Sequence, residues 1–220
     1  MIYSPSTKEG GNTIFSKFLN LNPEKQERIL NAAMKEFAQK GYKDASTNEI
    51  VKEAGISKGV LFHYFNNKKQ LFLFLYDYCI ELLMNEFYEK LDIKEKDFFV
   101  RLRQMQRIKF EIVNRHPEMF TFLQVAYLED APEVSQDLVH RNEKMIESSA
   151  GKVFEGIDTS KFRDDIDVGK VIKTVLWTFE GFAKEEMAKA KLRHESPLDY
   201  KKLFAEAEIY LQMFKNFFYK

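Results

Sequence analysis

The 220-residue sequence has few of the residues that stabilise disulfide-rich or turn-rich proteins: one Cys, five Pro and nine Gly. The single cysteine, Cys79, excludes an internal disulfide, and we expect it to be a small buried apolar residue. Scarce proline and glycine favour long helices over a β fold with many turns. Alternating apolar and polar runs are also few, so the sequence predicts an all-α protein.

Long apolar runs and catalytic motifs are missing as well. No run reaches the roughly 18 residues that a membrane-spanning helix needs, and the first residues lack the apolar stretch of a signal peptide. We therefore expect a cytoplasmic protein that does not enter membranes. There is no glycine-rich phosphate loop and no His-Glu-x-x-His motif, and the four histidines are scattered. We expect no metal, no cofactor and no enzymatic activity.

The net charge is zero, but the charges are unevenly distributed. Residues 1–72 contain 11 Lys and Arg against 7 Asp and Glu, which is net +4, and the rest of the chain is net −4. A basic segment is attracted to nucleic-acid phosphates. The acidic remainder discourages non-specific wrapping of DNA around the rest of the molecule.

Two short helices joined by a tight turn are predicted between residues 46 and 65. Ser46 precedes Glu49 by three residues, the pattern of a capping box that begins a helix. Gly55 suits the left-handed conformation that ends a helix, and Ser57 can cap the next one. This spacing is typical of a helix-turn-helix, whose second helix enters the DNA major groove. The alternative is an ordinary helical hairpin inside an all-α protein.

The surrounding sequence extends this motif over roughly Pro23 to Leu75, a block that resembles the N-terminal domain of the tetracycline-repressor (TetR) family. The positions that match in order are Phe37, Gly41, Tyr42, Thr47, Ile50, Ala54, Gly55, Ser57, Gly59, Leu61, Tyr64, Phe65, Lys68 and Leu71. The resemblance implies an N-terminal arm at 1–22, a three-helix DNA-binding domain at 23–70 and a helical effector-binding and dimerisation domain at 71–220. About nine helices are expected in all.

The apolar patch at Ile14, Phe15, Phe18 and Leu19 suggests one short extra helix on the DNA-binding domain. Beyond that domain, helices are expected at 98–116, 117–127, 132–154 and 168–192, followed by a last helix to the C-terminus.

The side chains expected to meet DNA either contact base edges or hold phosphates. Lys58, in the first turn of the second helix, can donate to guanine O6 and N7, although it could also be simply solvated. The resemblance assigns Tyr64 and Lys68 to phosphate. The expected DNA contacts are Thr47, Asn48, Lys58, Gly59, Val60, His63, Tyr64 and Lys68. Phe62 stands where the family usually has Tyr, so one hydroxyl contact is missing.

The last two helices carry apolar residues on more than one face, which means that they are buried on two sides. One explanation is burial in the centre of the subunit. The other, which the resemblance supports, is a homodimer that pairs these helices with their symmetry mates in a four-helix bundle. The candidate interface residues are Leu211, Phe214 and Phe218.

Aromatic residues gather in the middle of the chain. At helical spacing such residues are more often core, but the resemblance implies an apolar effector pocket in this region. The candidate ligand-binding residues are Phe110, Phe120, Phe122, Tyr127, Trp177 and Phe179.

The resemblance therefore implies a homodimeric transcriptional regulator. We expect a repressor that a small hydrophobic effector releases from a palindromic operator in double-stranded DNA. The alternative is a helical adaptor or structural protein that uses this fold to recruit a protein partner and binds DNA only non-specifically. An all-α enzyme has no candidate nucleophile or acid–base pair.

Overall fold

A computed structural model describes residues 15–193 and 198–220, which form ten helices. The described residues contain no β pairing beyond an isolated bridge between Phe162 and Tyr219, so the all-α prediction is confirmed. The chain divides into two compact units. The first contains the described residues up to Asn85 together with Glu118–Glu143, and the second contains Glu86–Pro117 and Lys144–Lys220.

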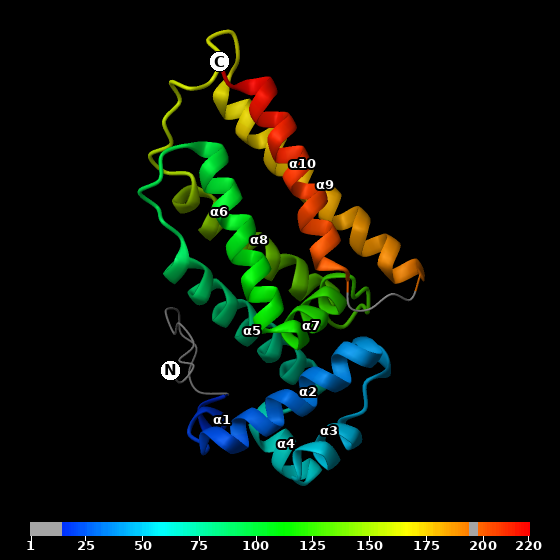
Figure 1. The fold of residues 1–220 in the computed structure, drawn as a ribbon. Coiled ribbons are helices and arrows are strands. Elements are labelled where there is room, and N and C mark those ends of the chain that lie inside the picture. The colour runs from blue at the N-terminus through cyan, green and yellow to red at the C-terminus, as the bar shows by residue number, and fades with distance from the viewer. Residues whose placement is uncertain (1–14, 194–197) are drawn as a thin grey trace. The chain divides into compact units, whose positions relative to one another are not determined.

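The helices follow one another in the order shown in Figure 1. The first unit contains α1 (Ser16–Leu19), α2 (Pro23–Asp44), α3 (Thr47–Ala54), α4 (Lys58–Phe65), most of α5 (Lys68–Lys90), most of α7 (Pro117–Tyr127) and the beginning of α8 (Ser135–Val153). The second contains the remainders of α5 and α8 with α6 (Phe98–Arg115), α9 (Val168–Arg193) and α10 (Tyr200–Phe218). None of the helices in these two described ranges is long and apolar enough to cross a membrane.

The short helix expected near the N-terminus is present as α1, which packs on α2 and α4. The ring of Phe18 is fully buried, with its centroid 4.8 Å from that of Phe65 on α4. The side-chain amide of Gln26 donates to the carbonyl of Leu19 at 2.9 Å and thereby ties the end of α1 to α2. Ile14 lies outside the described residues.

Three fully buried phenylalanine rings join α2, α5 and α7 in the core of the first unit. The centroids of Phe37 and Phe72 lie 4.9 Å apart, and those of Phe72 and Phe122 lie 5.4 Å apart. Each buried ring stabilises the fold by about 1.5–3 kcal/mol. Because Phe122 on α7 completes this core, the unit that contains the helix-turn-helix extends beyond the boundary at residue 70 that the motif suggests.

A buried polar network shapes the second unit. Arg101 on α6 is fully buried, and its guanidinium donates to the backbone carbonyls of Val153 at 3.0 Å and Ile93 at 2.7 Å. Asp97 caps α6 and also accepts hydrogen bonds from Lys161 at 2.8 Å and from the Tyr219 hydroxyl at 3.0 Å. Burial alone would raise the pKa of Asp97, but these hydrogen bonds outweigh it and hold the pKa below its usual value.

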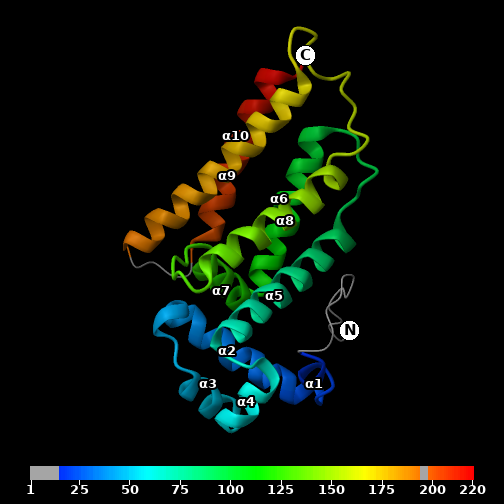
Figure 2. The same ribbon diagram turned by 180° about the vertical axis from the view of Figure 1, so that it is seen from behind.

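In both views of the second unit, the end of α10 lies beside the beginning of α9, and the two helices diverge from there (Figure 2). Val175 on α9 and Leu211 on α10 are fully buried between the helices of this unit, together with Phe98 and Phe162. The apolar residues of α9 and α10 therefore supply part of the core of a single subunit.

Candidate DNA-binding interface

The turn between α3 and α4 has the geometry expected of a helix-turn-helix. Gly55 ends α3 in the left-handed conformation at φ 65° and ψ 39°. The hydroxyl of Ser57 accepts a hydrogen bond from the backbone N–H of Val60 at 3.3 Å, which caps α4. Both predictions for this turn are confirmed, and they fix where α4 begins.

The prediction of a capping box at the start of α3 is wrong. In a capping box the glutamate three residues on accepts the backbone N–H of the capping serine. Here the N–H of Ser46 donates instead to Glu36 on α2, at 2.8 Å, and Glu49 is exposed. Within the described residues, the hydroxyl of Ser46 makes no capping bond to α3.

One side of α4 anchors the helix and the other side is exposed. Leu61 and Phe65 are fully buried in the core of the first unit, as expected. Lys58, Gly59 and His63 are exposed. A Cβ added at Gly59 would meet no described atom within 4 Å, so the space beside this backbone is open. An eight-residue helix is marginal on its own, and its buried side keeps it in place.

The first turn of α3 lies in the same unit. Asn48 is exposed and Thr47 is half-buried. The first turn of any helix has backbone N–H groups without helical partners and the positive end of the helix dipole, a combination that suits phosphate. This end of α3 remains a candidate phosphate site.

The three remaining DNA candidates are Val60, Tyr64 and Lys68. Val60 is partly buried against the core of the first unit, and the other two are engaged within the subunit. Tyr64 is 8% exposed. Lys68 donates from Nζ to the carbonyls of Lys43 and Ala45, both at 3.1 Å. Its Nζ also lies 4.7 Å from the centre of the Tyr42 ring. Lys68 thus holds the end of α2, a role that the sequence did not suggest, and its phosphate contact remains a prediction.

The six expected ligand-binding aromatics are divided between the two units. Phe122 is in the core of the first unit, to which Phe120 and Tyr127 also belong. Phe110, Trp177 and Phe179 belong to the second unit. The ring of Phe110 packs against Phe204, and Trp177 is 68% exposed.

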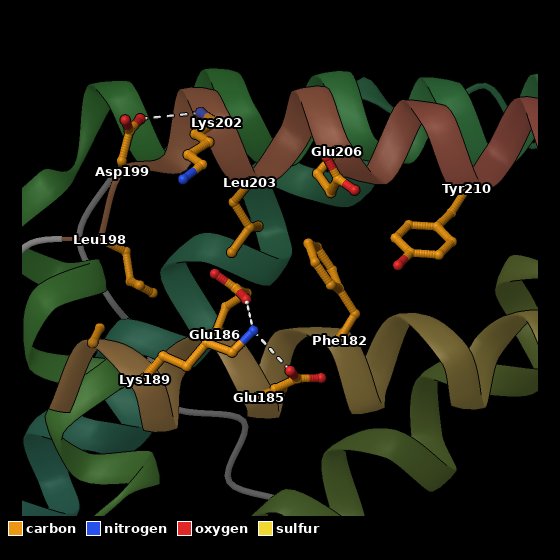
Figure 3. Close-up of a pocket in the computed structure, with 11 residues that line it drawn as sticks. Phe182, Glu185, Glu186, Lys189, Leu198, Asp199, Lys202, Leu203, Glu206 and Tyr210 are labelled. Atoms are coloured by element: carbon orange, nitrogen blue, oxygen red, sulfur yellow. Dashed lines mark hydrogen bonds and ion pairs between the residues drawn. The ribbon is translucent and has the colours of Figure 1, made fainter. Parts of the chain in front are cut away.

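A cleft of about 630 Å³ lies between α9 and α10, and none of those six aromatics lines it (Figure 3). Phe182 and Tyr210 project into it from the two helices, with ring centroids 5.6 Å apart. Lys189 pairs with the carboxylates of Glu185 and Glu186, both at 2.7 Å. The cleft is thus more polar than a site for a hydrophobic effector would be.

The expected dimer residues face inward. Leu211 is fully buried, and Phe214 and Phe218 are partly buried against the core of the second unit. A different stripe of α10 is exposed: Ile209, Met213 and Phe217 are 62%, 51% and 66% exposed. These three residues recur every four positions and therefore lie on one helix face.

Comparison with known proteins supports the motif and the fold. A sequence profile for bacterial regulatory proteins of the tetR family matches residues 29–75. YuxN of Bacillus subtilis, an uncharacterized HTH-type transcriptional regulator, is 35% identical over 100 residues, which are 44% of this chain and 33% of YuxN. The chain thus spans about a third of the length of that relative.

Two further proteins match over more of the chain. The HTH-type transcriptional repressor KstR2 of Mycolicibacterium smegmatis is 26% identical over 154 residues, 69% of this chain and 74% of KstR2. The crystal structure of a TetR family transcriptional regulator from Chloroflexus aurantiacus has a TM-score of 0.65 at 21% identity and covers 93% of this chain and 98% of its own. With its matching helix-turn-helix and its shared all-α fold, this chain belongs to the tetR family of bacterial regulatory proteins.

Proposed function

We propose that this protein is a cytoplasmic transcriptional regulator, a repressor that binds a palindromic DNA operator as a homodimer. The observation that carries the proposal is the two-sided character of α4. Leu61 and Phe65 anchor it in the core, while Lys58, Gly59 and His63 stay exposed. An anchored helix with one polar, accessible side is what base contacts in the major groove require.

The chemistry of each side chain determines whether it contacts a base or a phosphate. Lys58 donates to guanine O6 and N7, and Val60 offers methyl groups to a thymine methyl. Gly59 lets the backbone come close to DNA. Thr47 and Asn48 hold phosphate at the first turn of α3, with Tyr64 and Lys68 as further phosphate contacts.

The exposed stripe of α10 supports the dimer. Ile209, Met213 and Phe217 form this stripe, and Trp177 on α9 of the same unit is also exposed. Large apolar residues gathered on one exposed surface are typical of protein interfaces. We therefore place the interface on these residues rather than on Leu211, Phe214 and Phe218, whose side chains pack against the subunit's own core.

A small hydrophobic effector would release the repressor from DNA. It would have to bind the conformation that does not fit the operator, and linkage then requires DNA and effector to weaken each other by the same factor. A thermal-shift screen of fatty acids, acyl-CoA esters and sterols would find it, because a bound ligand raises the melting temperature by mass action. Each hit is then tested for loss of operator binding.

The test of DNA-binding function is selection of bound sequences from a random pool, followed by affinity measurements on selected and random DNA over a range of salt concentrations. A specific regulator binds the selected sequence about 10³-fold or more tighter than random DNA. Equal affinities would favour the alternative, a helical adaptor with only non-specific DNA binding. The matches to proteins named as transcriptional regulators and repressors count against that alternative.

A further inference from the structure

A carboxylate from a distant part of the chain holds the backbone that joins α2 to α3. Glu129, in the loop between α7 and α8, accepts a hydrogen bond from the backbone N–H of Tyr42 at 2.7 Å and another from the N–H of Ala131 at 3.1 Å. Glu129 and Tyr42 are 87 residues apart in sequence but lie in the same compact unit. Hydrogen bonds from an N–H to a carboxylate are roughly twice as strong as those between neutral groups.

The backbone at Gly41 makes room for this contact. Gly41 interrupts the helical conformation of α2 at φ 70° and ψ −174°, a region that is essentially restricted to glycine. A Cβ at this position would lie 3.1 Å from Oε2 of Glu129. The absence of a side chain at Gly41 therefore lets the carboxylate reach the N–H of Tyr42.

The other end of the junction is held from α2 and α5. Glu36 accepts the N–H of Ser46 at 2.8 Å, and Lys68 donates to the carbonyls of Lys43 and Ala45. The next residue, Thr47, begins α3. Glu129 thus connects the α7–α8 loop to this junction through hydrogen bonds.

We propose that Glu129 is a positioning residue for DNA binding, since it fixes the α2–α3 junction and thereby the first turn of α3 with Thr47 and Asn48. This inference rests on the proposed function. Without the contact, a smaller fraction of molecules holds α3 in the DNA-binding position, and the apparent affinity for DNA falls in proportion to that fraction. The change in charge alone would raise the affinity for DNA instead, because removing a carboxylate favours binding to a polyanion.

The test compares Glu129→Ala with Glu133→Ala in the full chain. Glu133 is exposed and lies in the same loop, so both variants lose one negative charge from the same segment. The operator is the sequence that the wild type selects from a random pool. Affinities for operator and random DNA are measured at one salt concentration, at a temperature where both variants are folded. Hydrogen exchange of the Tyr42 amide is measured on free protein.

Glu133→Ala should bind DNA as tightly as the wild type or slightly tighter. Glu129→Ala should bind both the operator and random DNA about tenfold more weakly, because the contacts of Thr47 and Asn48 are to phosphate and do not depend on sequence. Its Tyr42 amide should exchange about tenfold faster, the factor expected when one charge-assisted hydrogen bond is lost. Glu129→Gln keeps the side-chain size and one acceptor oxygen, so it should show a smaller effect and guards against a folding defect.

Two results would overturn the inference: operator binding by Glu129→Ala as tight as that of Glu133→Ala, or an unchanged exchange rate at Tyr42. A wild-type protein that enriches no sequence would instead overturn the proposed function, and with it the DNA-binding part of this inference. Exchange at Tyr42 would then decide separately whether Glu129 holds the junction.

Discussion

Replacing Phe217 by alanine should weaken the proposed dimer strongly without unfolding the subunit. Full burial of a phenylalanine side chain contributes about 1.5–3 kcal/mol. Phe217 is 66% exposed in one subunit, so the partner can bury at most about two-thirds of it, or roughly 1–2 kcal/mol. A two-fold interface contains the residue twice, which gives about 2–4 kcal/mol and a rise in the dimer dissociation constant of about 30-fold to several hundredfold.

Sedimentation equilibrium over a range of protein concentrations measures that constant. Asn216→Ala is the matched control, because Asn216 is the exposed neighbour of Phe217 on α10 but lies off the stripe formed by Ile209, Met213 and Phe217. Trp177, the only tryptophan in the sequence, is 68% exposed in one subunit. Its fluorescence should therefore shift to shorter wavelength on dimerisation. A Phe217→Ala variant with the dissociation constant of the wild type would refute the assignment of this face.

Three further predictions concern the two units separately. Gly41→Ala should lower the free energy of unfolding by about 1–3 kcal/mol in urea denaturation, because a φ of 70° strains any side chain. Gly59→Ala should leave stability equal or higher, because a Cβ at Gly59 meets no described atom within 4 Å. Lys68→Ala should lower the melting temperature, since two hydrogen bonds to backbone carbonyls are lost. If Lys68 also holds a phosphate, the slope of log affinity for DNA against log salt concentration should fall in magnitude by about one. A lower melting temperature with an unchanged slope would make its role purely structural. Because the pKa of Asp97 is depressed in the folded state, the ionised carboxylate stabilises the fold at neutral pH, and this stabilisation is lost as the pH falls below about 4. Asp97→Asn should therefore be less stable than the wild type at pH 7 and should lose less stability between pH 5 and pH 3. Equal losses of stability in acid would contradict this.

Local sequence signals predicted the helix-turn-helix well because its key features involve neighbouring residues. Gly55 and Ser57 act within a few residues of their own positions, and both adopt the expected geometry. The capping box failed because the N–H of Ser46 found a partner on another helix, Glu36. No pattern within the α3 sequence contains that information.

The two apolar faces of α10 show another limit of prediction from sequence. Its sequence has one apolar series at Leu211, Phe214 and Phe218 and another at Ile209, Met213 and Phe217, and periodicity alone cannot tell which series packs inside the subunit. Contacts with α6 and α9 decide this, since they bury the first series and leave the second exposed.

Contacts between distant residues could not be predicted at all. Glu129 has no motif around it, and it reaches Tyr42 in a unit where α7 packs on α2 and α5 through Phe122. A single sequence carries no signal for a pair separated by 87 residues.

The central claim is that α4 recognises base sequence through its exposed side, and the most direct test is a parallel selection from random DNA with the wild type and with Lys58→Ala. The wild type should enrich a palindromic sequence, and the variant should enrich the same sequence with relaxed preference at one or two base pairs in each half-site, a loss of about 1–3 kcal/mol at those positions. Identical sequence preferences in the two selections would contradict the role of Lys58, and the absence of any enriched sequence with the wild type would contradict the account of α4 as a recognition helix.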